Sequence, residues 1–348
     1  MSEKSFETKR FVVKMLSVLL AVCLCVCCVS CAKTNYVSKT YLMMDTVIEI
    51  KLICDYKTAQ PIFTRCGEMM SQIESVLSRT VSESTVSQFN RTGEAVLDAD
   101  TEAVLQTALD VSAATEGAFD PTVERLIALW NTCAEDDRLP TEAEMQEALL
   151  SVGVSHLALT GRELTRVHPN TAIDLGGIGK GYAIDRVLAY LKTTDISGGV
   201  VSFGGNIAVF GRKSNGKPYQ IGLKDPNDTA DILGYLEMSS GVISVSGDYE
   251  RYVTIQGKRY HHILDPENGY PADNGLRSVA VICENGVLAD ALSTALFVMG
   301  REKALDFYHK EKFDFEAILI TDHEIVLTDG LASSGCFALT DSSYSLSS

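Results

Sequence analysis

The sequence predicts an α+β protein that folds as one domain with two lobes. Apolar residues recur at helical spacing in two segments of the first half, 61–79 and 101–115. After residue 172 the pattern changes to short β-like runs with two further helical segments. A chain of 348 residues that is 46% hydrophobic can bury a full core, which excludes global disorder and a small disulfide-stapled scaffold. We find no repeat of 20–50 residues.

Residues 1–30 have the features of a secretory signal peptide. Basic residues from Lys4 to Lys14 precede an apolar run of roughly 15 residues, which is short for a membrane-spanning helix of about 20. An uncleaved anchor is the alternative. The segment ends in Cys28-Val-Ser-Cys31, which resembles a bacterial lipobox and implies that Cys31 is lipidated. We therefore expect a lipid-anchored protein at the cell membrane, facing outside the cytoplasm.

The ten cysteines do not indicate a disulfide framework. Five of them lie between Cys23 and Cys31, and the others are scattered without CxxC or zinc spacing. The formal charge of −16 argues against nucleic acid, which is bound through Lys and Arg. Cleavage after residue 30 removes four basic and two acidic residues and brings the charge to −18. An anion must therefore be bound at a local site, where a metal ion or backbone N–H groups supply positive charge.

The expected elements follow one another along the chain. Residues 31–40 are a polar tether, the acidic stretch 135–137 is a solvated loop, and 172–175 end a strand. Helices are expected over 61–79, 101–115, from a capping box at Thr141 and Glu144 to about Leu150, 179–192 and 287–308. Strands are expected at 47–53, 200–210, 219–223, 235–238, 242–245, 252–255, 277–283, 317–320 and 325–327, before a polar tail at 341–348.

The stretch Asp174-Leu-Gly-Gly-Ile-Gly-Lys-Gly-Tyr-Ala-Ile-Asp185 places glycines between an expected strand and an expected helix. Backbone N–H groups and the helix dipole can meet a phosphate at such a junction. The stretch is not a Walker A motif, because position 181 is glycine. It is not a dinucleotide GxGxxG motif either, because Tyr182 takes the place of the last glycine. A tight strand–helix turn is the alternative.

Two further segments carry candidate site residues. Adjacent His261 and His262 on a strand point to opposite faces, so one can line a site while the other faces solvent, and Asp265 then starts a turn. Asp290 and Thr294 are four residues apart in a helix, which puts their oxygens on one face and suits a hard cation such as magnesium. The alternatives are a structural His-x-x-Asp and a first-turn acid favoured by the helix dipole.

Taken together and in this order, several segments resemble the ApbE family of FAD:protein FMN transferases. They are Met44-Asp-Thr46, the series Ser78, Ser87 and Asn90, Gly117-Ala-Phe-Asp-Pro121, Asp174 to Ala183, Gly204-Gly-Asn206, Ser246-Gly-Asp-Tyr249, His262-Ile-Leu-Asp-Pro266 with Gly269 and Pro271, and Ala289-Asp290 with Thr294. The resemblance covers roughly residues 41–330. It implies a flavin transferase domain over 41–340, with an ApbE-like, T-fold-related α+β fold and a flavin bound between two lobes.

The resemblance also implies a magnesium-dependent reaction. FAD is cleaved at its pyrophosphate, FMN passes to a Thr or Ser hydroxyl of an Rnf- or Nqr-type flavoprotein subunit, and AMP leaves. Magnesium would be bound by Gly177, Asp290 and Thr294, and FAD by Met44, Ala118, Phe119, Asp120, Asp174, Lys180 and Leu264. His262, with Asp265, is the candidate for positioning or deprotonating the hydroxyl.

Thr80 stands where an aromatic ring is usual in the family, so we expect weaker stacking on FAD. Two other functions fit the same residues. In a FAD pyrophosphatase, water replaces the acceptor hydroxyl. A flavin-binding lipoprotein without catalysis is the alternative from another class, although a binder needs no pair of metal ligands.

Overall fold

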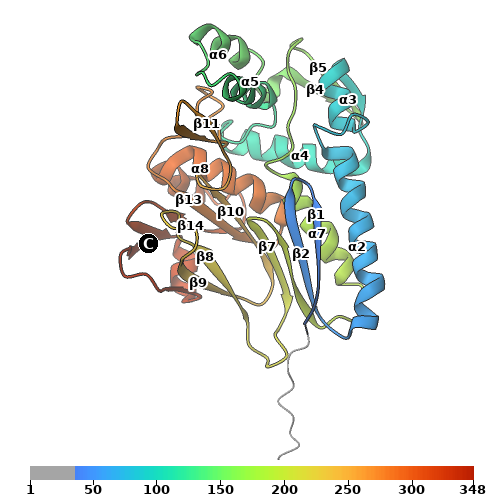
Figure 1. The fold of residues 1–348 in the computed structure, drawn as a ribbon, viewed down its shortest axis with the longest axis vertical. Coiled ribbons are helices and arrows are strands. Elements are labelled where there is room, and N and C mark those ends of the chain that lie inside the picture. The colour runs from blue at the N-terminus through green and yellow to red at the C-terminus, as the bar shows by residue number, and fades with distance from the viewer. Residues whose placement is uncertain (1–35) are drawn as a thin grey trace, which may run out of the picture. The chain divides into compact units, whose positions relative to one another are not determined.

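A nine-stranded sheet is the centre of the fold in residues 36–348, the part of the chain that the structure, a computed structural model, describes (Figure 1). The predicted signal peptide and Cys31 lie outside the described residues. The strands follow in the order β1 (Tyr36–Met43), β2 (Thr46–Ile53), β6 (Gly198–Phe203), β7 (Asn206–Gly211), β10 (Gly241–Gly247), β13 (Ser278–Cys283), β14 (Glu316–Ile320), β15 (Glu324–Leu327) and β17 (Ser345–Ser347). Neighbouring strands are antiparallel except β15 and β17, which are parallel.

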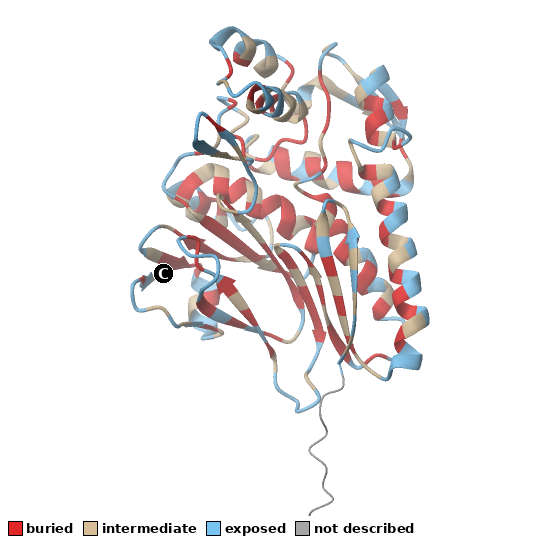
Figure 2. Cartoon of the chain, viewed as in Figure 1, coloured by how far each residue is buried: buried red, intermediate tan, exposed pale blue. Residues whose placement is uncertain are grey.

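The two faces of this sheet carry different cores, because successive side chains of a strand point to opposite sides. In β14, Ala317 and Leu319 belong to the core under the helices, whereas Ile318 and Ile320 belong to the core on the other face. A three-stranded sheet covers that second face: β16 (Phe337–Leu339), β9 (Ile232–Met238) and β8 (Tyr219–Lys224). Both faces of the central strands are buried in Figure 2. Because both faces of β13 and β14 are buried, their sequences are almost continuously apolar.

Helices cover the first face and build a second lobe. The helices, in chain order, are α2 (Tyr56–Leu77), α3 (Thr85–Thr92), α4 (Ala99–Ala114), α5 (Glu124–Glu135), α6 (Glu142–Leu149), α7 (Gly179–Leu191), α8 (Gly286–Tyr308) and α9 (Asp329–Ser334), with a 3₁₀ turn at Val154–His156. Helices α7 and α8 lie against the sheet (Figure 1). None of the helices in residues 36–348 has the length and apolar character needed to cross a bilayer.

The second lobe has a core of its own. It consists of α5, α6 and the two-stranded sheet of β11 (Tyr252–Ile255) and β12 (Lys258–His261). The Trp130 indole donates a hydrogen bond to the Gly269 carbonyl at 2.8 Å, which ties α5 to the turn after β12. Gly269 has φ +78°, and a Cβ there would lie 2.3 Å from the Met145 sulfur, so glycine is required. A separate three-stranded sheet consists of β3 (Glu94–Val96), β5 (Glu163–Arg166) and β4 (Leu157–Thr160), in that order.

Helices α7 and α8 cross at two glycines. A Cβ on Gly181 would lie 2.0 Å from the Gly286 carbonyl oxygen, and one on Gly286 would lie 2.7 Å from the Gly181 oxygen. Each helix also caps the other. The Asp185 carboxylate of α7 accepts from the N–H groups of Gly286 and Val287 at 2.7 and 2.8 Å, and the Asp290 carboxylate of α8 accepts from the Gly181 N–H at 3.0 Å. The crossing therefore fixes Asp290 against the start of α7.

The structure confirms most of the expected helices and strands and corrects others. The tether expected over 31–40 is wrong from Tyr36 onward, because Tyr36–Met43 is the edge strand β1. The polar tail expected at 341–348 is wrong as well, since β17 extends the sheet and the buried Tyr344 hydroxyl donates to Asp225. The run 200–210 is two strands joined at Gly204. Instead of a strand end, residues 172–175 form only a bridge from Ala172 to Val123.

We predict that Gly181→Ala lowers the free energy of unfolding by about 1–3 kcal/mol. The added methyl group meets the backbone of Gly286, which cannot move aside as a flexible side chain would. Gly179→Ala in the same helix is the matched control. A Cβ at Gly179 meets its nearest atom, Leu77 Cδ1, at 3.6 Å, which is an ordinary contact. Urea unfolding of both variants checks the prediction, and equal midpoints would contradict the close helix crossing.

Candidate active site

A cavity of about 400 Å³ lies beside the starts of α7 and α8. Its walls come from the β6–β7 turn, the end of β10, the first residues of α7, one face of α8, the Ala118–Asp120 loop and the segment around β11 and β12. A smaller cavity of about 170 Å³ shares Arg79, Asp174, Gly176, Lys180 and Arg251 with it. Residues far apart in the sequence therefore meet in one concave site.

The structure brings together ten of the twelve residues expected in the site. Those lining the larger cavity are Ala118, Phe119, Asp120, Asp174, Gly177, Lys180, His262, Leu264, Asp290 and Thr294. Met44 lines the smaller cavity, together with Thr80, which stands where the family usually has an aromatic ring. Asp265 lines neither cavity.

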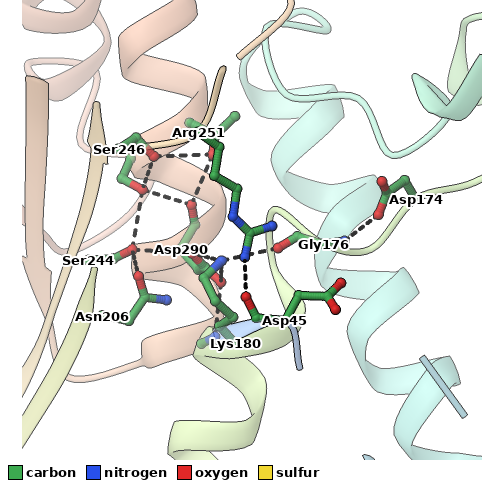
Figure 3. A network of polar contacts seen from close by, with 12 residues as sticks. Asp45, Asp174, Gly176, Lys180, Asn206, Ser244, Ser246, Arg251 and Asp290 are labelled. Carbon is green, nitrogen blue, oxygen red and sulfur yellow. Dashed lines mark hydrogen bonds and ion pairs between the residues drawn. The ribbon is translucent and has the colours of Figure 1, made fainter. Parts of the chain in front are cut away.

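Asp290 is the buried acid of the site. The residue is only 4% exposed, and its carboxylate accepts from the Gly181 N–H at 3.0 Å and from the Ser244 hydroxyl at 3.3 Å. The Lys180 ammonium lies 3.4 and 3.5 Å from the two Asp290 oxygens and donates to the Gly176 carbonyl at 3.1 Å. Figure 3 shows Lys180 between the glycine loop and Asp290. A buried carboxylate needs such partners, because desolvation penalises its charge.

Hydroxyl groups continue this network along the floor of the cavity. Ser246 Oγ lies 2.8 Å from Ser293 Oγ and 3.4 Å from Thr294 Oγ1. The Ser244 hydroxyl donates to Asn206 Oδ1 at 2.8 Å (Figure 3). The Asn206 amide nitrogen is buried and has no partner in the described part of the chain. The Ser246 and Asn206 motifs carry the resemblance, but the sequence assigned them no role.

The residues around Asp290 fit a hard cation. A Cβ on Gly177 would lie 3.8 Å from Thr294 Oγ1, so the glycine backbone and the threonine hydroxyl are neighbours. Carboxylate, hydroxyl and carbonyl oxygens are ligands that magnesium accepts, usually together with water and substrate phosphate. In residues 36–348 no group of three or more His, Cys, Asp or Glu side chains gathers as a metal site. The donor set fits magnesium shared with a phosphate.

The glycine loop before α7 is held by charge. Asp174 accepts from the Gly176 N–H at 2.6 Å and pairs with Arg79 at 3.1 Å. Asn90 fixes Ile173, the residue before Asp174. Its side-chain amide donates to the Ile173 carbonyl at 2.8 Å and accepts from the Ile173 N–H at 2.7 Å. The loop therefore presents its backbone to the cavity in a fixed conformation.

Phe119 and Asp120 form a buried wall. The Phe119 ring packs over Gly177, where a Cβ would lie 3.3 Å from the ring. Burial raises the pKa of Asp120, while its hydrogen bonds from Thr122 oppose the shift. Apolar and aromatic side chains elsewhere on the wall include Trp130 and Tyr260, whose ring centroids are 5.2 Å apart. This part of the cavity can accommodate a flat ring system.

His262 is held in one tautomer by its own hairpin. Its Nδ1 lies 3.0 Å from the Arg251 carbonyl oxygen, which can only accept, so Nδ1 carries the hydrogen and Nε2 is left as an acceptor. Part of the ring is open to the cavity. The protein packed around it, followed by the charges of Arg251 and Lys180, nevertheless lowers its pKa to about 4. His262 is therefore neutral at neutral pH.

The neighbouring His261 does not face solvent, although strand alternation had predicted that one of the two histidines would. His261 is half-buried, its Nε2 lies 3.0 Å from the Ala272 carbonyl, and its ring meets Phe297 edge-on. Strand β12 ends at His261, so His262 belongs to the following turn.

The catalytic role expected for Asp265 is not supported by its placement. Its carboxylate accepts from the Glu267 N–H at 2.9 Å and from the Asn268 amide at 2.6 Å, both within the turn after His262. Its oxygens are occupied in shaping the turn that Gly269 completes. These contacts are those of a turn-forming residue, and the catalytic role of Asp265 stays a prediction.

Met44 and Asp45 form the tip of the β1–β2 hairpin in the left-handed region, with φ of 53° and 54°. Such values are costly for residues other than glycine and persist where the surroundings impose them. Two contacts do so here. The Met44 N–H donates to Glu74 at 2.7 Å, and the Asp45 carbonyl accepts from Arg251 at 3.1 Å.

Comparisons with known proteins agree with this geometry. The model of the ApbE family matches residues 44–319. The FAD:protein FMN transferase of Haemophilus influenzae is 30% identical over 329 residues, which are 90% of this chain and 95% of that protein. The solved ApbE protein of Thermotoga maritima is similar with a TM-score of 0.79 and 33% identity, over 86% of this chain and 99% of that one. The flavin transferase ApbE of Vibrio cholerae has a TM-score of 0.78 and 27% identity over the same shares.

These matches confirm the mixed α/β single-domain fold and the resemblance on which the sequence prediction rested. The chain belongs to the ApbE family.

Proposed function

We propose that this protein is a FAD:protein FMN transferase, as its curated relatives are named. One observation carries the proposal beyond family membership. A single cavity combines a neutral histidine with a free Nε2, an ammonium group beside a buried carboxylate, and the oxygen donors of Asp290 and Thr294. Phosphoryl transfer needs positioning, charge neutralisation and a group that orients or accepts the proton of the nucleophile.

In the proposed reaction the acceptor hydroxyl of a partner protein enters beside His262. Its oxygen attacks the phosphorus of the FMN half of FAD, its proton goes to His262 Nε2, and the bond to the AMP phosphate breaks with its electron pair on AMP. Lys180 and the backbone before α7 bind the phosphate oxygens. Phe119, Leu264 and Met44 bind the rings of FAD and exclude water from them.

We propose that magnesium binds to Asp290, Thr294 and the Gly177 carbonyl when FAD is present. When bound, the ion neutralises charge on the pyrophosphate. Without it, Lys180 is the charge that faces Asp290. The long contact of Lys180 with Asp290 supports carboxylate oxygens that a metal ion can bind. The Asn206 amide nitrogen, which has no partner among the described residues, is a donor and suits a phosphate oxygen.

The setting of the reaction is proposed from the sequence. The signal segment and Cys31 support a lipid-anchored enzyme on the outer face of the cell membrane, acting on an Rnf- or Nqr-type subunit.

Water is a competing nucleophile, because His262 is open to the cavity. Hydrolysis of FAD to FMN and AMP is therefore a measurable side reaction.

The transfer itself is tested by incubating the purified full-length chain with FAD, magnesium and an Rnf- or Nqr-type acceptor domain. We expect in-gel flavin fluorescence on the acceptor and AMP in equal amount. An authentic flavin transferase under the same conditions is the positive control. Release of AMP without a labelled acceptor would identify a pyrophosphatase. If neither AMP nor labelled acceptor formed, the protein would be a flavin-binding protein without catalysis.

We predict that His262→Gln lowers the transfer rate roughly 10²- to 10⁴-fold, the usual contribution of a general base. His309→Gln, which changes an exposed histidine on the surface, is the matched control. Retention of full activity in His262→Gln would exclude His262 as the base.

The pH dependence of transfer follows from the lowered pKa. A base works in its unprotonated form, so kcat/KM should stay level above about pH 5 and decline as pH falls through about 4. The unfolded chain holds this proton more tightly, so stability also falls between pH 6.5 and about 4, and circular dichroism must confirm folding at each pH. An acid limb near 6.5 would contradict the environment described for His262.

We predict that Asp290→Asn abolishes the stabilisation of the protein by magnesium with ADP. In the native chain, magnesium at 100 times its dissociation constant should add about 2.7 kcal/mol to the free energy of unfolding. Asp306→Asn, at an exposed position of the same helix, should leave that gain intact. A gain of equal size in Asp290→Asn, measured by thermal unfolding, would rule out Asp290 as a ligand.

A further inference from the structure

Arg251 occupies the junction of the two cavities. Its side chain lines both of them and reaches across to the tip of the β1–β2 hairpin, where Nη2 donates to the Asp45 carbonyl at 3.1 Å. Figure 3 shows the guanidinium beside Asp45, Gly176 and Lys180, in front of Asp290. The side chain is exposed to the cavity space and not packed in a core.

Among residues 36–348, no carboxylate forms an ion pair with Arg251. Of the three Lys and Arg side chains that line the larger cavity, Arg79 pairs with Asp174 at 3.1 Å and Lys180 faces Asp290 at 3.4 Å. Within residues 36–348 no carboxylate, that of neighbouring Glu250 included, lies within 4 Å of the Arg251 guanidinium nitrogens. An uncompensated cation is notable in a chain whose net charge is −16.

The backbone of Arg251 positions the candidate base. Its carbonyl oxygen accepts from the His262 N–H at 3.1 Å and from His262 Nδ1 at 3.0 Å. The Arg251 side chain and the His262 imidazole therefore extend from neighbouring points of the hairpin. An anion that contacts the guanidinium lies in the space between His262, Lys180 and the metal-ligand candidates.

We propose that Arg251 is a phosphate-binding catalytic residue of this enzyme. Its guanidinium binds the pyrophosphate of FAD and stabilises the negative charge that grows on the departing AMP phosphate. A guanidinium carries five N–H donors, so one bond to the Asp45 carbonyl leaves a pair free for a bidentate contact with phosphate. This inference rests on the proposed transferase function for its substrate, and it adds a residue that the sequence did not single out.

A purely structural role makes a different prediction. If Arg251 only fastens the Met44–Asp45 turn, its loss should loosen that turn, which is held in an unfavourable backbone conformation. Arg251→Gln removes the charge but keeps a polar side chain, and hydrogen exchange of the turn amides measures separately whether the turn loosens. Arg251→Gln therefore separates the two roles.

The experiment measures ADP affinity by calorimetry, in the presence of magnesium, for the full-length chain, Arg251→Gln and Arg251→Lys. Arg259→Gln, an exposed arginine of the same hairpin that lines neither cavity, is the matched control. We expect Arg251→Gln to weaken ADP binding about 10- to 100-fold, Arg251→Lys to keep part of the affinity, and Arg259→Gln to match the native chain. Unchanged ADP affinity in Arg251→Gln would overturn the proposal.

Two further readouts complete the test. Hydrogen exchange of the Met44 and Asp45 amides should be unchanged in Arg251→Gln. Exchange that accelerates together with the loss of ADP affinity would assign a turn fastener and overturn the proposal. At saturating FAD, kcat for transfer should fall at least tenfold, and a normal kcat would refute the catalytic part. The ADP and exchange measurements need no acceptor, so they still test Arg251 if the transferase assay fails.

Discussion

The close crossing of α7 and α8 is the constraint on which the site depends. At Gly181 and Gly286 the two helix backbones approach so closely that neither position tolerates a Cβ. Reciprocal caps complete the contact, with Asp185 on the start of α8 and Asp290 on the start of α7. Asp290 thereby reaches the beginning of the helix that carries Lys180. A shift of either helix by an ångström would separate the carboxylate, the ammonium and the glycine loop.

The second organising problem is charge. An acidic chain must hold an anionic substrate in a cavity whose lining already includes four acids, Asp120, Asp174, Glu250 and Asp290. The structure pairs two of them with cations of the same lining, Asp174 with Arg79 and Asp290 with Lys180. Positive potential then comes from Arg251, from backbone N–H groups before α7, and in the proposed reaction from a metal ion. The overall charge contributes nothing favourable, so affinity is local.

The smaller lobe contributes precision to the same cavity. Trp130, Met145 and Gly269 fix the turn after β12, and Asp265 shapes that turn with its carboxylate. This turn also fixes His262, whose tautomer is set by the Arg251 carbonyl. A general base positioned by packing and by a backbone acceptor keeps its geometry when substrate enters. The larger lobe thus supplies Asp290, Lys180 and the glycine loop, and the smaller one supplies Arg251 and the proposed base, His262.

The sequence by itself determined the class of fold, the long helices and most of the central strands, because periods of 3.6 and 2 report which face of an element is buried. Its resemblance to the ApbE family implied ten of the residues that line the larger cavity. Periodicity does not report what covers a face or pairs with an edge. For that reason residues 36–43 and 345–347 were expected as tether and tail, although both form strands. Only the tertiary structure brought Lys180 and Asp290 together across 110 residues, assigned the oxygens of Asp265 to a turn, and placed Arg251 between two cavities. These placements depend on helix crossing and hairpin docking, which are long-range contacts that no local pattern encodes.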